Sequence, residues 1–175
     1  MMNRENIVVL DFGGQYSHLI TRRIRDLSVY AELLPYDTPS HEIELLNPSG
    51  IILTGGPSSV YDDNSPKPDS KIFDLNIPIL GICYGLQIIV DAMGGSINRT
   101  NKREYGKANL SILSDQKLFH GIDSTTDVWM SHGDKINSVP KGFEKIGSST
   151  NSNISAIADK RKNIYISIYI YDVKK

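Results

Sequence analysis

Residues 78–87 read Pro-Ile-Leu-Gly-Ile-Cys-Tyr-Gly-Leu-Gln, and this stretch decides the fold. The apolar run 77–82 leads directly into Cys83, and apolar residues at helical spacing follow over 86–93. A buried strand that turns sharply into a helix, with a glycine two positions before and after a nucleophile, is a nucleophile elbow. The pattern therefore predicts that the side chain of Cys83 is presented at the carboxyl end of a strand.

The start of this helix and a second glycine pair offer the groups that a cysteine nucleophile needs. A helix N-terminus favours the thiolate of Cys83, and the backbone N–H of Tyr84 is a candidate oxyanion donor. Gly55-Gly56 ends the apolar run 51–53. Because the carboxyl ends of neighbouring parallel strands meet at one sheet edge, the N–H of Gly56 is a second candidate donor. The alternatives are a buried structural cysteine and an ordinary strand-ending turn.

Strand-like and helix-like patterns alternate along the first half of the chain. The predicted strands cover 7–10, 29–34, 51–53 and 77–82, and the predicted helices cover 16–27, 41–46, 71–75 and 86–93. After Gly95, short β-like runs dominate, at 109–113, 128–130, 143–146, 154–158 and 164–171. This order predicts a single α/β domain over 1–175. Its central sheet is mostly parallel and flanked by helices, with additional antiparallel strands in the C-terminal half.

The composition is that of an ordinary globular protein. A net charge of −1 over 175 residues gives no global field that would attract nucleic acid or an anionic membrane. No apolar run approaches the roughly 20 residues that span a bilayer, and residues 1–10 do not read as a signal peptide. Cys83 is the single cysteine, so no intrachain disulfide can form. We therefore expect a cytoplasmic protein without a nucleic-acid or membrane partner.

Five stretches, read together, resemble the class I glutamine amidotransferases, and within them the amidotransferase part of GMP synthase. The cysteine elbow and the double glycine are shared by the whole family, whereas the first and last stretches point to the GMP synthase branch. The stretches are 10–16 (Leu-Asp-Phe-Gly-Gly-Gln-Tyr), 55–60 (Gly-Gly-Pro-Ser-Ser-Val), 78–87, 103–106 (Arg-Glu-Tyr-Gly) and 127–134 (Asp-Val-Trp-Met-Ser-His-Gly-Asp). The resemblance covers roughly 7–165 and implies a flavodoxin-like fold.

The resemblance implies a glutaminase that feeds a synthetase. Proteins of this family form a γ-glutamyl thioester on the cysteine that matches Cys83, and backbone groups matching Gly56 and Tyr84 form the oxyanion hole. The ammonia passes to an ATP-pyrophosphatase unit that aminates adenylated XMP to GMP. The positions that contact substrate glutamine in the family match Gly55, Gln87, Ser131, His132 and Gly133, and Asp134 matches a residue near the opening toward the synthetase unit.

His132 has two interpretations. A histidine partner is the usual activator of a cysteine, and in the first interpretation His132 is the base that activates Cys83. The resemblance instead places it in the substrate-binding loop, which we favour. The remaining histidines, His18, His41 and His120, match no catalytic position and are expected to be structural or surface residues.

The tail departs from the family. The family base lies on a strand reading roughly aromatic-Tyr-Gly-Val-Gln-Phe-His-Pro-Glu, whereas residues 164–172 read Ile-Tyr-Ile-Ser-Ile-Tyr-Ile-Tyr-Asp. Aligned without gaps, Ile170 takes the histidine position and Asp172 the glutamate position, and no histidine follows His132. Asp172 alone is a poor substitute, because its normal role would be to orient a histidine. After Tyr165 the composition changes abruptly to a tail rich in isoleucine, tyrosine and lysine. This change suggests a frameshift or a truncated gene product, and we expect an impaired glutaminase.

Three functions remain open at this stage. The chain is the glutaminase component of GMP synthase, a degenerate amidotransferase that binds glutamine or docks the synthetase without turnover, or another elbow hydrolase such as a cysteine peptidase. The segment 129–134 argues against the last. No phosphate-binding loop of the SGGxDS type is present, so ATP and Mg²⁺ are expected to belong to the synthetase unit. No cofactor and no metal site are expected in this chain, because Cys83 stands alone and the four histidines are scattered.

Overall fold

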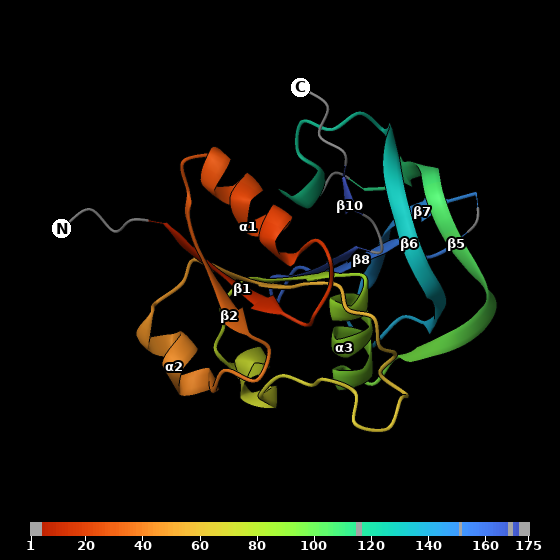
Figure 1. The fold of residues 1–175 in the computed structure, drawn as a ribbon. Coiled ribbons are helices and arrows are strands. Elements are labelled where there is room, and N and C mark those ends of the chain that lie inside the picture. The colour runs from red at the N-terminus through yellow and green to blue at the C-terminus, as the bar shows by residue number, and fades with distance from the viewer. Residues whose placement is uncertain (1–4, 115–116, 151, 168–169, 172–175) are drawn as a thin grey trace.

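The computed structural model describes residues 5–114, 117–150, 152–167 and 170–171, with the backbone alone for 99–105, 130–134 and 170–171. Within these ranges the strands form one ten-stranded sheet in the order β10-β6-β5-β7-β8-β9-β4-β3-β1-β2 (Figure 1). The sheet has a parallel part and an antiparallel part, and they meet at β9.

The parallel part contains the strands that lead to the cysteine. Its members are short and apolar, as expected for strands that are covered on both faces. Four successive parallel pairings join them. In sheet order they are β2 (Tyr30–Pro35), β1 (Asn6–Asp11), β3 (Gly50–Leu53), β4 (Ile79–Ile82) and β9 (Ile164–Ser167).

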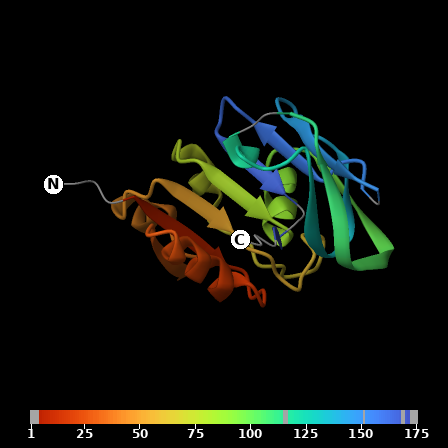
Figure 2. The same ribbon diagram turned by 90° about the horizontal axis from the view of Figure 1, so that it is seen from above.

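The antiparallel part continues the sheet beyond β9. Neighbouring strands in it are joined by antiparallel pairings. The pair β5–β6 is the longest, with register shifts between Ser96 and Ile97 and between Arg99 and Glu104. Figure 2 shows this pair at the opposite end of the molecule from β1 and α1. The strands are β5 (Ser96–Ile112), β6 (Thr125–Ser138), β7 (Glu144–Ser149), β8 (Ala156–Asp159) and β10 (Ile170–Tyr171).

Helices cover both faces of the parallel part. Figure 1 shows α1 on one face and α2 and α3 on the other, as right-handed crossovers in opposite directions along the sheet require. The helices are α1 (Ser17–Asp26), α2 (Ser40–Leu45) and α3 (Tyr84–Ala92), with two 3₁₀ turns, η1 (Ser70–Asp74) and η2 (Lys117–Phe119). One hydrophobic core runs through both parts of the sheet, from Val8 and Leu53 to Leu110 and Ile157. No helix in the described residues is long and apolar enough to cross a membrane.

The α/β fold with a parallel central sheet and antiparallel C-terminal strands confirms the prediction. Three details were wrong. The strands expected at 109–113 and 128–130 belong to the much longer strands β5 and β6. The helix expected at 71–75 is the 3₁₀ turn η1, and the strand expected over 164–171 is two strands with different partners, β9 beside β4 and β10 beside β6. Sequence periodicity could not separate them, because isoleucine and tyrosine alternate through both and only the choice of neighbour differs.

Candidate active site

Cys83 lies at the turn between β4 and α3 in an unusual backbone conformation. Its φ is 51° and its ψ is −107°, a left-handed geometry that costs a non-glycine residue about 1–3 kcal/mol. The turn is held from both sides: the Cys83 N–H donates to the carbonyl of Ser167 (3.2 Å), and the Cys83 carbonyl accepts from the N–H of Leu86 (3.0 Å). The backbone is therefore the strand–turn–helix that the elbow pattern predicts.

The two glycines of the elbow allow the backbone to pass closely. A Cβ added at Gly81 would come within 2.8 Å of the Gly85 carbonyl oxygen, and one added at Gly85 would overlap the carbonyl of Leu53. The Gly85 N–H donates to the Thr54 carbonyl (3.0 Å). The first turn of α3 is thus seated directly on the end of β3, where no side chain fits.

This seating brings the Gly55-Gly56 turn beside the cysteine. A Cβ built at Gly55 would lie 3.4 Å from the Cβ of Cys83, and one built at Gly56 would lie 3.2 Å from the Tyr84 ring. In the described part of the chain, the backbone N–H groups of Gly56 and Tyr84 have no hydrogen-bond partner. Buried backbone donors are normally paired, so two unpaired donors beside a cysteine make a suitable oxyanion site.

Burial works against ionisation of the thiol. Cys83 is half-buried, and burial raises the pKa of its thiol to about 12. The expectation that the helix N-terminus favours the thiolate is therefore outweighed by desolvation, which disfavours a charged sulfur. A cysteine that acts at neutral pH needs a cation or an imidazole to reverse this effect.

Gln87 and Tyr84 secure the loops around the elbow. The Gln87 side chain is buried and its Oε1 accepts from the Val60 N–H (3.2 Å), so it ties α3 to the loop after Gly56. The Tyr84 hydroxyl donates to the Pro66 carbonyl (2.7 Å), and burial raises the pKa of this phenol.

The stretch predicted to bind substrate lies on β6. Ser131 and His132 pair with Tyr105 and Glu104 of β5, and only their backbone is described. β6 and β4 are far apart in the sheet order. The chain after β9 nevertheless connects the turn at Cys83 with β6. Ser167 bonds to Cys83, and Ile170, three residues later, pairs with Trp129 of β6. Three residues reach at most about 11 Å, so Ile170, the partner of Trp129 in β6, lies within that distance of Ser167.

The predicted sites in the tail are only partly described. The backbone of Ile170 lies in β10, and Asp172 lies outside the described residues, as does the side chain of Asp134. Sequence reasoning missed the Ser167 carbonyl and Thr54 as parts of the site. Thr54 directly precedes the double glycine, and that position was the available signal.

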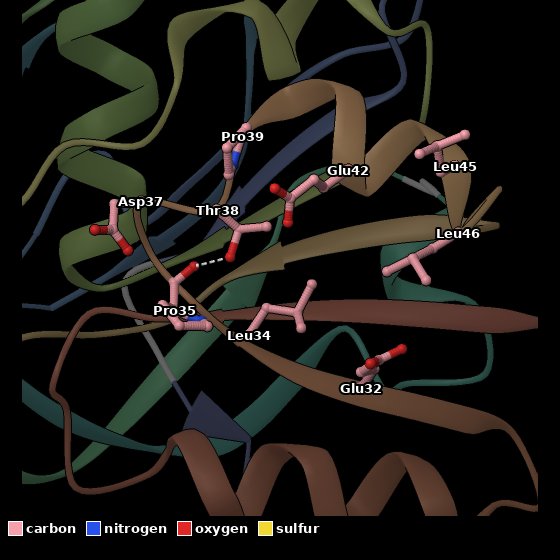
Figure 3. Close-up of a pocket in the computed structure, with 9 residues that line it drawn as sticks. All are labelled: Glu32, Leu34, Pro35, Asp37, Thr38, Pro39, Glu42, Leu45 and Leu46. Atoms are coloured by element: carbon pink, nitrogen blue, oxygen red, sulfur yellow. Dashed lines mark hydrogen bonds between the residues drawn. The ribbon is translucent and has the colours of Figure 1, made fainter.

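The described residues hold no candidate metal cluster, and one hollow that they line lies away from the elbow. Among the described residues, no group of three or more His, Cys, Asp or Glu side chains could hold a metal ion. An open hollow of about 610 Å³ lies between β2 and α2 and contains none of the predicted site residues (Figure 3). It is lined by three carboxylates, one threonine and five apolar side chains, namely Glu32, Leu34, Pro35, Asp37, Thr38, Pro39, Glu42, Leu45 and Leu46.

Comparison with known proteins agrees with the fold. The model of the family "Glutamine amidotransferase class-I" matches residues 8–168, and this chain belongs to that family. A solved structure from Thermoplasma acidophilum, described as one of the subunits of a GMP synthase, has a TM-score of 0.86 and 31% identity, and the match covers 97% of this chain and 85% of that one. A glutamine amidotransferase from Thermotoga maritima, with a TM-score of 0.73 and 20% identity, shares the fold over 96% of this chain and 76% of that one.

Within the family, the chain is similar to GMP synthase. It is 50% identical over 164 residues to the glutamine-hydrolysing GMP synthase of Aquifex aeolicus, a match covering 94% of this chain and 32% of that protein. It is 51% identical over 162 residues to the enzyme of the same name from Staphylococcus epidermidis, covering 93% of this chain and 31% of that protein. The chain thus spans about a third of the length of these relatives, and by homology it corresponds to their amidotransferase part.

Proposed function

We propose that this chain is the glutaminase component of GMP synthase. In this proposal the Cys83 sulfur attacks the side-chain amide carbon of glutamine, and the N–H groups of Gly56 and Tyr84 bind the oxyanion that forms. The C–N bond then breaks, the nitrogen takes up a proton, and ammonia leaves a γ-glutamyl thioester. Water cleaves the thioester to give glutamate and the thiol.

One observation carries this proposal. The Cβ of Cys83 is 3.4 Å from where a Cβ on Gly55 would be, so the sulfur-bearing residue and a turn with an unpaired N–H are in direct contact. The unpaired N–H of Tyr84 adds a second donor on the other side of the cysteine. Preorganised donors of this kind contribute about 10²–10³ each to kcat. The family match and the similarity to GMP synthase support glutamine as the substrate.

The wider role follows from the same comparison. We propose that the ammonia is delivered to an ATP-pyrophosphatase unit that converts XMP to GMP, with Asp134 near the interface and Gln87 and 131–133 at the glutamine. ATP and Mg²⁺ belong to that unit. A catalytic thiol must stay reduced, so a cytoplasmic location is part of the proposal.

We further propose that the glutaminase activity is impaired. The family match ends at residue 168, two residues before Ile170, which takes the position of the family histidine. Two steps need a proton carrier, the departure of ammonia and the activation of water, and general acid–base help contributes about 10²–10⁴ to each. The raised pKa of Cys83 adds a third deficit. These observations also favour the second candidate function, a module that binds glutamine or docks the synthetase without turnover.

Ammonia release from glutamine tests both proposals, with and without an added ATP-pyrophosphatase unit. We expect slow release that the Cys83→Ala variant abolishes. Replacing residues 170–172 by His-Pro-Glu should raise the rate by at least about 100-fold, the low end of the general acid–base contribution. Turnover by the unaltered chain at the rate of an intact amidotransferase would refute the impairment. Cys83-independent release would refute the glutaminase assignment, and glutamine binding without release in either protein would establish the binding module.

A further inference from the structure

The turn that offers the Gly56 N–H is covered by a second segment, Phe12–Gly14. A Cβ built at Gly14 would overlap the carbonyl oxygen of Gly55, and one built at Gly56 would come within 2.7 Å of the Phe12 carbonyl oxygen. The two segments are therefore in backbone-to-backbone contact. Neither can shift without the other.

This contact sets the direction of the Gly56 N–H. The described peptide bonds include no cis bond, and in a trans peptide the C=O and the N–H point to opposite sides. With the Gly55 oxygen held against Gly14, the N–H of the same peptide points away from Gly14. Two successive glycines offer little steric resistance to a flipped peptide, so the turn needs an external restraint to keep one orientation.

Three side chains provide that restraint. Thr54 and Ser17 are buried, at 0% and 1% exposure, and their hydroxyl oxygens lie 3.1 Å apart. Ser17 Oγ also lies 2.7 Å from Asp11 Oδ1. Because a carboxylate only accepts, Ser17 donates to Asp11. The Thr54 hydroxyl has one proton, and the acceptors within its reach are the Leu10 carbonyl (2.9 Å), the Ser17 hydroxyl (3.1 Å) and the carbonyl of Gly55 itself (3.3 Å).

The same three residues bind the covering segment. Thr54 Oγ1 accepts from the Phe12 N–H (3.3 Å) and Asp11 Oδ1 accepts from the Gly13 N–H (2.9 Å). The carbonyl of Thr54 accepts from the first turn of α3, at Gly85 (3.0 Å). Thr54 thus connects the turn, the segment above it and the helix that begins at the cysteine.

We infer that Thr54, Ser17 and Asp11 are positioning residues, which hold the Gly55–Gly56 peptide in the orientation that aims the Gly56 N–H for oxyanion binding. The inference rests on the proposed glutaminase function for its catalytic consequence. Its structural part, a restrained peptide, does not depend on that function. None of the three residues needs to contact glutamine.

Two variants of one residue separate positioning from packing. Thr54→Val removes the hydroxyl and keeps the shape of the side chain, whereas Thr54→Ser keeps the hydroxyl. Asp11→Asn, which keeps an acceptor oxygen but no charge, is a second test if Thr54→Val does not fold. Circular dichroism and thermal melting establish folding before either measurement.

The first measurement is inactivation by a glutamine analogue in which the side-chain amide is replaced by a chloromethyl ketone, at pH 9. The maximal inactivation rate reports oxyanion binding and the half-saturating concentration reports ground-state binding. Iodoacetamide, which forms no oxyanion, controls for thiol reactivity. For Thr54→Val we expect a roughly 10–100-fold lower maximal inactivation rate. The half-saturating concentration and the iodoacetamide rate should stay within about threefold of the unaltered protein. Thr54→Ser should recover the maximal inactivation rate. An unchanged maximal rate, or an equal loss with iodoacetamide, overturns the inference.

The second measurement is amide hydrogen exchange over 50–60 in the free protein. We expect exchange at Gly55 and Gly56 to be at least about tenfold faster in Thr54→Val, while strands β7 and β8 are unchanged, because only local opening is affected. If the unaltered protein reacts with iodoacetamide but not with the analogue, the proposed function fails, and hydrogen exchange alone tests whether Thr54 restrains the Gly55–Gly56 peptide. Equal exchange at Gly55 and Gly56 in the unaltered protein and in Thr54→Val overturns that restraint.

Discussion

The alkylation rate of Cys83 should keep rising with pH well beyond the range of an ordinary cysteine. The thiolate is the reacting species, and burial raises the pKa of this thiol from 9.0 to about 12. At pH 7 the thiolate fraction is then about 10⁻⁵, compared with about 10⁻² for a thiol of pKa 9. We expect the rate to increase tenfold per pH unit from pH 7 to about pH 11, and to be about a thousandfold below that of an unperturbed thiol at pH 7.

Iodoacetamide alkylation, followed by mass spectrometry of the peptide that contains Cys83, measures this rate. N-acetylcysteine amide and the same chain unfolded in urea serve as controls, and circular dichroism at each pH shows that the protein stays folded. The slope is more informative than the absolute rate, because restricted access lowers the rate equally at every pH. A plateau between pH 8 and 9 would refute the reasoning, since it would show that some group compensates the desolvation of the sulfur.

Three further predictions concern stability and ionisation. Because the folded state raises the pKa of Cys83 above its unfolded value, the free energy of unfolding is unaffected below pH 9 and falls above it. Urea denaturation should show a loss of about 1.4 kcal/mol from pH 8 to pH 10 relative to Cys83→Ala. If the stabilities of the two proteins changed equally with pH, the raised pKa of Cys83 would be contradicted. Gly85→Ala would overlap the end of β3 and should cost about 3 kcal/mol by overpacking, so a midpoint equal to that of the unaltered protein would disprove the close approach. The carboxylate of Asp69 accepts from the N–H groups of Ser40 (2.9 Å) and Lys71 (3.0 Å), which hold its pKa at about 2; an NMR titration that gives an ordinary value near 4 would show that these bonds do not persist in solution.

The site separates two requirements of a cysteine nucleophile, its presentation and its activation. Presentation comes from Gly81, Gly85 and Cys83 itself, whose strained backbone is held by bonds to β9 and to α3. Activation needs a charge or a proton acceptor beside the sulfur. The side chain at position 170 is an isoleucine, which offers neither. Under the proposed impairment, the chain keeps the whole elbow and lacks the proton carrier at one position.

The edge of β2, the last strand in the described sheet, is unsuited to the addition of a further strand. The guanidinium of Arg25 donates to the Ala31 carbonyl (2.6 and 3.0 Å). The Pro35 carbonyl accepts from the hydroxyl of Thr38 (2.8 Å), and proline has no N–H to offer. Occupied carbonyls and an edge proline are the usual protection of an edge strand.

The sequence by itself determined the elbow, the order of strands and helices in the parallel half, and the family. Each depends on short-range patterns. A continuous apolar run predicts a covered strand, and glycines flanking Cys83 predict a turn that no side chain can enter. The contacts that the structure shows at Gly81 and Gly85 give the physical reason for this pattern.

Only the tertiary structure decided what surrounds the sulfur. The hydrogen bond from Cys83 to Ser167, the network through Thr54, and the contact with Gly55 join residues that lie 28 to 84 positions apart in the chain. Desolvation of the thiol depends on the packing of all of them, and that is why the sequence suggested a favoured thiolate where the structure raises the pKa. The tail shows the same limit: alternation of isoleucine and tyrosine predicts a strand, but the available neighbours determine that it pairs with β4 first and with β6 afterwards.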